Sequence, residues 1–160
     1  MTRRAGLITA TVLLTVLPTA AQTGQHSSGS KLKRTLLASG LQGSIGSAIG
    51  PDGALYIPEG GAGRISRIDT QSGTVSTFAS GLPTSPASLA FGATDVAFLG
   101  DTAYVLVTLV GPEVGGKDID GIYRVDGPKS FTVVANIARW SIAHPPLTAF
   151  DIPTGVQYAL

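Results

Sequence analysis

Three carboxylates in a short glycine-rich segment are the first residues whose type and spacing could do chemistry. Glu113, Asp118 and Asp120 lie within eight positions, inside residues 110–120. Calcium takes several oxygen ligands at once, and carboxylates commonly supply them. The segment lacks the alternating D-x-D-x-D-G pattern of an EF-hand loop, so a solvated loop explains it more simply. The sequence favours the loop and leaves a divalent cation such as calcium open as a cofactor.

Four other acidic residues lie in or next to predicted turns and strand ends. They are Asp52, Glu59, Asp69 and Asp126. In such positions an aspartate commonly accepts hydrogen bonds from nearby backbone N–H groups and thereby stabilises the turn. We therefore expect structural turn roles for all four residues.

The remaining candidates for a site are one histidine and three aromatic residues. His144 could act as a general base or a metal ligand near neutral pH, but no nucleophile or orienting carboxylate is indicated for it, and no G-x-S-x-G or H-E-x-x-H motif occurs. Trp140, Phe150 and Tyr158 could line a ligand surface, although such aromatic residues more often belong to a core. The sequence therefore assigns no catalytic or cofactor-binding residue, leaves a metal site undetermined and favours a protein that is not an enzyme.

The composition is that of an ordinary globular protein rich in turns. The chain has 160 residues and a net charge of +1, so there is no basic excess that would attract nucleic acid. It contains 21 glycines and 10 prolines but only 6% aromatic residues, which favours short strands joined by tight turns. Cysteine is absent, which excludes disulfides, thiolate catalysis and cysteine metal sites.

The first 21 residues predict a secretory signal peptide. Arg3 and Arg4 precede an apolar run over residues 5–17, which Pro18 and the small residues 19–21 follow. The run is too short to cross a bilayer, so we expect cleavage after Ala21, no stable membrane span afterwards, and a secreted protein, extracellular or periplasmic. The pattern leaves the Sec and twin-arginine export routes open. Residues 22–31, rich in Ser, Gly and Gln, predict a disordered spacer before a folded domain over residues 32–160.

A near-repeat predicts the fold of that domain. The sequence TLLASGL at 35–41 returns as TFASGL at 77–82, a spacing of 41 between Leu41 and Leu82. A repeat period of between about 40 and 50 residues, in a sequence with the pattern of β-strands, is typical of β-propeller blades. A closed propeller needs about four blades or more, so we expect an all-β, incomplete β-propeller after an N-terminal signal helix, with further blades beyond Leu160.

The strand pattern predicts about two blades, the first outer strand and the start of a third blade. Residues 32–39 are expected to form an outer strand that completes a blade formed by later residues. The first full blade is expected to use residues 43–49, 54–58, 64–69 and 74–80, and the second to use 87–91, 95–99, 103–109, 121–126 and 131–137, with an insertion at 110–120. Residues 140–146 predict a proline-rich loop, and residues 150–160 an inner strand.

Three segments resemble a known group of propellers: GPDGALYI at 50–57, RISRID at 64–69 and ASGLP at 79–83. They are similar to the NHL and SMP-30/gluconolactonase-like six-bladed propellers. The leader, the long second blade and FDIPTGVQYAL at 150–160 resemble more narrowly the ScyD/ScyE family of secreted bacterial proteins, over most of residues 32–160. That resemblance implies an exported propeller of undefined activity. In lactonase-like relatives, acidic residues near the position of Glu59 help to hold a divalent cation in the axial channel.

Three hypotheses about function remain open at this point. The first is a secreted, non-catalytic ScyD/ScyE-type propeller that binds an unidentified ligand or protein partner. The second is a lactonase-like, metal-dependent hydrolase of the SMP-30/gluconolactonase type. The third is an inactive fragment of either, because a ring that cannot close leaves strand edges exposed.

Overall fold

The computed structural model describes residues 34–88, 90–148 and 151–160. All of these residues except Arg34 lie in one compact unit, Thr35–Leu160. The signal peptide at 1–21 and the spacer at 22–31 lie outside the described residues, so both stay predictions. No helix in the described part of the chain combines the length and the apolar character needed to cross a membrane.

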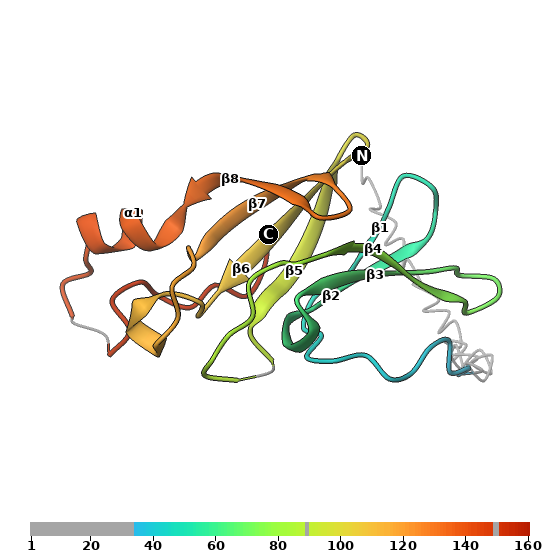
Figure 1. Cartoon of the computed structure of the whole chain (residues 1–160), viewed down its shortest axis with the longest axis horizontal. Helices are drawn as coiled ribbons and strands as arrows, with labels where there is room; N and C mark the ends of the chain where they lie inside the picture. Colours follow the sequence, from blue (N-terminus) through green and yellow to red (C-terminus); the bar gives the residue numbers. More distant parts are fainter. Residues whose placement is uncertain (1–33, 89, 149–150) are drawn as a thin grey trace, which may run out of the picture. The chain divides into compact units, whose positions relative to one another are not determined.

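The unit consists of two four-stranded antiparallel sheets in which each strand pairs with the next one along the chain (Figure 1). The first sheet contains β1 (Ala48–Ile49), β2 (Leu55–Glu59), β3 (Arg64–Ile68) and β4 (Val75–Ser80), and the second contains β5 (Gly92–Leu99), β6 (Thr102–Thr108), β7 (Gly121–Gly127) and β8 (Ser130–Asn136). Four-stranded meanders of this kind are propeller blades. The prediction of an all-β, incomplete β-propeller is therefore confirmed.

The core lies between the two blades. Tyr56 and Ile65 of the first blade and Val105 and Val107 of the second are buried in one apolar cluster. The Tyr56 ring also contacts Phe98 of β5 in an edge-to-face arrangement, with 4.8 Å between ring centroids, a favoured aromatic geometry. Because alternate residues of a strand point to opposite faces, one face of each blade supplies this core.

Both blades are closed by a similar joint, in which a carbonyl oxygen just before the third strand accepts two backbone hydrogen bonds from residues just after the fourth. The carbonyl oxygen of Gly63, before β3, accepts hydrogen bonds from two N–H groups just after β4, and the carbonyl oxygen of Asp120, before β7, accepts two from residues 137 and 138 just after β8. Gly63 has φ 58°, and a Cβ there would lie 2.5 Å from the Leu82 carbonyl oxygen. The first joint therefore requires glycine, whereas the second accommodates an aspartate.

Before β5, two of the predicted strands are wrong and one is much shorter than expected. Residues 34–39 form no strand, nor do the described residues 87, 88, 90 and 91, and the predicted strand at 43–49 is reduced to β1. Just before and within the second of these segments, the hydroxyls of Ser85 and Ser88 accept hydrogen bonds from the backbone N–H groups of Ala87 and Ala90. Such local bonds compete with a strand ladder. The prediction for residues 32 and 33 lies outside the described residues.

The structure also corrects the region after the second blade. Residues 140–143, predicted as part of a loop, belong to helix α1 (Ile137–Ala143), which follows β8 directly (Figure 1). The Asn136 side chain caps this helix by accepting a hydrogen bond from the Arg139 N–H at 2.8 Å. Residues 151–160, predicted as part of an inner strand, form no strand. The insertion at 110–120 is confirmed between β6 and β7, with a short 3-10 helix, η2 (Pro112–Val114).

Candidate functional site

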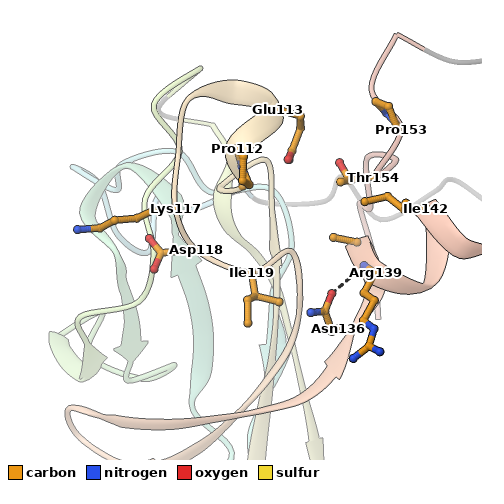
Figure 2. Close-up of a pocket in the computed structure, with 12 residues that line it drawn as sticks. Pro112, Glu113, Lys117, Asp118, Ile119, Asn136, Arg139, Ile142, Pro153 and Thr154 are labelled. Atoms are coloured by element: carbon orange, nitrogen blue, oxygen red, sulfur yellow. Dashed lines mark hydrogen bonds between the residues drawn. The ribbon is translucent and has the colours of Figure 1, made fainter.

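A pocket of about 560 Å³ lies at the end of the second blade, between the insertion and α1 (Figure 2). Its walls come from three segments that are distant in sequence. They are Gly111, Pro112, Glu113, Lys117, Asp118 and Ile119 of the insertion, Asn136, Ala138, Arg139 and Ile142 at α1, and Pro153 and Thr154 of the C-terminal segment. Ligand pockets are typically concave, mostly apolar and edged by a few polar groups, and this pocket has that form.

The insertion holds its shape through backbone hydrogen bonds. Gly116 donates its N–H to the Gly111 carbonyl oxygen at 2.9 Å, and Asp118 donates its N–H to the Val110 carbonyl oxygen at 3.1 Å. A Cβ at Gly116 would lie 1.9 Å from that Val110 oxygen. The chain can therefore double back only with glycine at position 116, and this tight turn sets the pocket wall.

Asp120 is the buried carboxylate behind that wall. Its side chain is fully buried, and its Oδ1 accepts a hydrogen bond from the Val110 N–H at 2.8 Å. Its Oδ2 has no hydrogen-bond partner among the described residues. Burial raises the pKa of Asp120 to about 6; the Val110 N–H opposes this rise, and the nearby Glu113 carboxyl adds to it. The Glu113 carboxyl therefore disfavours ionisation of Asp120.

Thr154 brings a second buried oxygen to the pocket. The residue is only 5% exposed, and its Oγ1 has no hydrogen-bond partner in the described part of the chain. Its segment is held by Gln157, whose Nε2 donates to the Thr154 carbonyl oxygen at 3.1 Å. The Oε1 of Gln157 in turn accepts a hydrogen bond from the Thr108 hydroxyl of β6 at 3.1 Å. The segment that carries Thr154 is thus held to the second blade, while the Thr154 hydroxyl itself has no partner among the described residues.

The three carboxylates for which the sequence leaves calcium binding open do not come together in one site. Asp120 is buried, whereas Glu113 and Asp118 are exposed, and the Asp118 carboxylate lies on the Lys117 side of the pocket, away from Glu113 (Figure 2). Among the residues that the structure describes, no group of three or more metal-ligating side chains is found. The structure therefore offers no observation that favours calcium at the insertion.

Glu59 has a different role from the predicted turn. It is fully buried, and it accepts hydrogen bonds from Arg64 Nε at 3.0 Å, from the Gln42 N–H at 2.8 Å and from the Ser66 hydroxyl. Burial raises the pKa of Glu59, but these hydrogen bonds outweigh it and the pKa is lowered overall. The carboxylate forms a structural ion pair inside the first blade, and both of its oxygens are engaged.

Of the three aspartates predicted to stabilise turns, two do so. Asp52 accepts a hydrogen bond from the Ala54 N–H at 3.2 Å, and Asp69 accepts one from the Ser72 N–H at 2.8 Å. Asp52 also pairs with Arg67 Nε at 2.6 Å. The prediction is wrong for Asp126, which lies within β7 and accepts hydrogen bonds from two side chains, Arg124 and Thr132, instead of turn N–H groups.

His144, Trp140 and Tyr158 do not line this pocket. The His144 ring stacks on Trp140 with 4.6 Å between ring centroids, and its Nδ1 lies 2.9 Å from the Trp140 carbonyl oxygen. Trp140 and Tyr158 are exposed at 62% and 58%, so neither belongs to the core. Trp140 and His144 line a smaller pocket of about 250 Å³. Phe150 lies outside the described residues.

Sequence reasoning missed the residues that α1 and the C-terminal segment bring to the pocket. Asn136 could have signalled the helix, because Asn is a preferred N-cap and the seven residues after it contain neither Gly nor Pro. Thr154 carried no comparable signal. Its place at the pocket depends on the tertiary contact between Gln157 and Thr108.

Comparisons with known proteins show only a distant structural likeness. No family model matches the chain, and no curated protein sequence matches it. The chain is similar to the solved PQQ-bound aldose sugar dehydrogenase from Streptomyces coelicolor, with 18% sequence identity and a TM-score of 0.46. The match covers 63% of this chain and 31% of that protein, so the chain corresponds to about a third of its length.

Proposed function

We propose that the chain is part of an exported β-propeller that binds a small ligand or a protein segment in the pocket between the insertion and α1. The observation that carries this proposal is the pocket itself, about 560 Å³ in volume, with the Thr154 hydroxyl in its wall, which has no hydrogen-bond partner among the described residues. A buried polar atom without a partner costs free energy in the empty protein. A ligand that supplies the partner would recover that cost.

The observations favour binding over lactonase-like hydrolysis. The axial carboxylate that the lactonase resemblance singles out, Glu59, already has hydrogen bonds to both oxygens. Binding a cation there would require breaking the pair with Arg64. With a net charge of +1, the chain has no electrostatic reason to bind nucleic acid, so a small molecule or a protein remains the expected partner.

The family and the location belong to the same proposal. The ScyD/ScyE resemblance and the leader at residues 1–21 support a secreted bacterial propeller cleaved after Ala21. Intact-mass measurement of protein recovered outside the cytoplasm tests this directly. Export predicts a loss of mass equal to residues 1–21, and recovery of the uncleaved chain in the cytoplasm alone would refute it.

Filling the pocket tests the binding role. Ala138 lines the pocket on α1, whereas Ala143, on the same helix, does not. We expect a screen of small amphipathic compounds, followed by amide chemical shifts, to perturb residues around the pocket in the wild type and in Ala143→Trp. The Ala138→Trp variant should lose these perturbations. Equal perturbation in both variants would place binding elsewhere and refute the proposal.

A further inference from the structure

We propose that the pocket selects a primary ammonium group carried on an apolar body, either a free amine or a lysine side chain, with the ammonium held between Glu113 and Thr154. This inference rests on the proposed binding function and names the class of its ligand. An ammonium has three N–H donors and no acceptor. It therefore suits a pocket end where oxygen atoms lack donors.

The oxygen atoms at this end of the pocket come from the insertion and the C-terminal segment. Figure 2 shows the Thr154 side chain turned toward Glu113 across the pocket. The Thr154 Oγ1 is buried and has no partner in the part of the chain that the structure describes, and Glu113 supplies an exposed carboxylate on the facing wall. Hydrogen bonds from an ammonium to a carboxylate are short and about twice as strong as those between neutral groups.

Asp120 reinforces this preference from behind the wall. Its Oδ2 has no partner among the described residues, and the nearby Glu113 carboxyl disfavours ionisation of Asp120. A positive charge placed beside Glu113 relieves that repulsion. An anionic ligand would increase it.

The other charged residues of the pocket do not oppose a cation at this end. Lys117, Asp118 and Arg139 also line the pocket. Figure 2 shows the Lys117 ammonium at the far side and the Arg139 guanidinium directed away from Glu113 and Thr154. The positive groups are therefore separated from the end where the ammonium would lie.

The rest of the pocket suits an apolar body. Ile119, Ala138 and Ile142 also line it. Burying apolar surface against such side chains contributes roughly 25 cal/mol per Å². The proposed ligand therefore combines one ammonium group with a hydrocarbon or aromatic body.

Three probes with one apolar body test the selectivity. They are 3-phenylpropylammonium, 3-phenylpropan-1-ol and 3-phenylpropanoate, which differ only in the polar end. Binding is measured by amide chemical-shift titration of the protein at pH 7.5. We expect the ammonium to bind at least about tenfold more tightly than the alcohol, the order of one charge-assisted hydrogen bond, and the carboxylate to bind most weakly.

Two variants locate the ammonium, and a third is the control. Glu113→Gln removes an exposed charge, and Thr154→Val replaces the hydroxyl with a methyl group. Each should weaken binding of the ammonium probe by about tenfold and affect binding of the alcohol less. Asp101→Asn removes an exposed carboxylate from the β5–β6 turn and should leave all three affinities unchanged.

The outcomes separate this inference from the proposed function. If the alcohol or the carboxylate binds the pocket as tightly as the ammonium, the selectivity is wrong while the binding role stands. The same conclusion follows if the ammonium binds the pocket but neither Glu113→Gln nor Thr154→Val weakens it. If no probe perturbs the pocket residues, the inference and the proposed function both fail.

Discussion

Replacing Asp120 with asparagine should change how the stability of the protein depends on pH. Asparagine keeps an oxygen to accept the Val110 N–H and, like a protonated carboxyl, has a donor but no charge. Burial raises the pKa of Asp120 from an ordinary 3.8 to about 6. The folded state therefore holds this proton more tightly than the unfolded state does. The resulting stabilisation is fully present below about pH 4 and is lost as the pH rises through 6.

The size of the effect follows from the two pKa values. At about 1.4 kcal/mol per pKa unit, the interval from 3.8 to about 6 corresponds to about 3 kcal/mol. The free energy of unfolding of Asp120→Asn, compared with that of the wild type, should therefore rise by most of this amount, about 2 kcal/mol, between pH 4 and pH 8, because the unfolded carboxyl is already partly ionised at pH 4. This figure is an upper value, because a buried carboxylate that ionises can draw water toward itself.

Urea unfolding followed by circular dichroism at pH 4, 5, 6, 7 and 8 measures this difference. Other acidic residues whose pKa values are lowered, such as Asp52 and Asp69, contribute equally to both proteins and cancel. Asp118→Asn is the matched control, since it removes an exposed carboxylate from the same insertion, and it should follow the wild type. A difference between Asp120→Asn and wild type that stays constant from pH 4 to pH 8 would refute the reasoning.

Three further substitutions test the fold by urea unfolding at pH 7. Glu59→Gln should cost about 2 kcal/mol, because an amide N–H₂ would face the donors that now bind a buried carboxylate; a cost under about 0.5 kcal/mol would contradict a structural ion pair. Gly63→Ala should lower the free energy of unfolding by more than Gly53→Ala, for which about 1 kcal/mol is expected. Both glycines have a positive φ, but only at position 63 would a Cβ approach backbone atoms. Equal losses of stability would disprove the tight joint. Asn136→Ala should cost about 1 kcal/mol and lower helical circular dichroism through loss of the α1 cap, and unchanged helicity would contradict the cap.

The strands that could be predicted from the sequence are those whose partners lie next to them along the chain. β2, β3 and β4 follow one another through turns that begin or end with glycine, and β6 to β8 repeat this order with one insertion. Local pattern and turn chemistry were sufficient there. Residues 151–160 have the sequence pattern of a strand but pair with no described strand. An extended segment becomes a strand only when it has a hydrogen-bonded neighbour, which sequence pattern alone does not reveal.

The candidate site was predictable only on one of its walls. The acidic insertion drew attention because of its carboxylates, but their spacing did not show that Asp120 would be buried while Asp118 remained exposed. That division follows from the joint before β7, where the backbone of residue 120 bonds to the start of α1. The wall that contains Thr154 depends on the hydrogen bond between Thr108 and Gln157, which lie 49 positions apart in the sequence.

The comparison of the two blade joints explains why the site lies on the second blade. At the first joint, Gly63 leaves no room for a side chain because the Leu82 carbonyl oxygen occupies the place of a Cβ. At the second joint, the insertion folds around Asp120 and binds its Oδ1 through the Val110 N–H. Its other oxygen remains buried without a partner in the described part of the chain. Leaving such a group unpaired destabilises the protein, and a cation beside the neighbouring Glu113 would favour ionised Asp120 and so offset part of that cost. The insertion thus links the structural closure of the blade to the pocket in which we propose that a ligand binds.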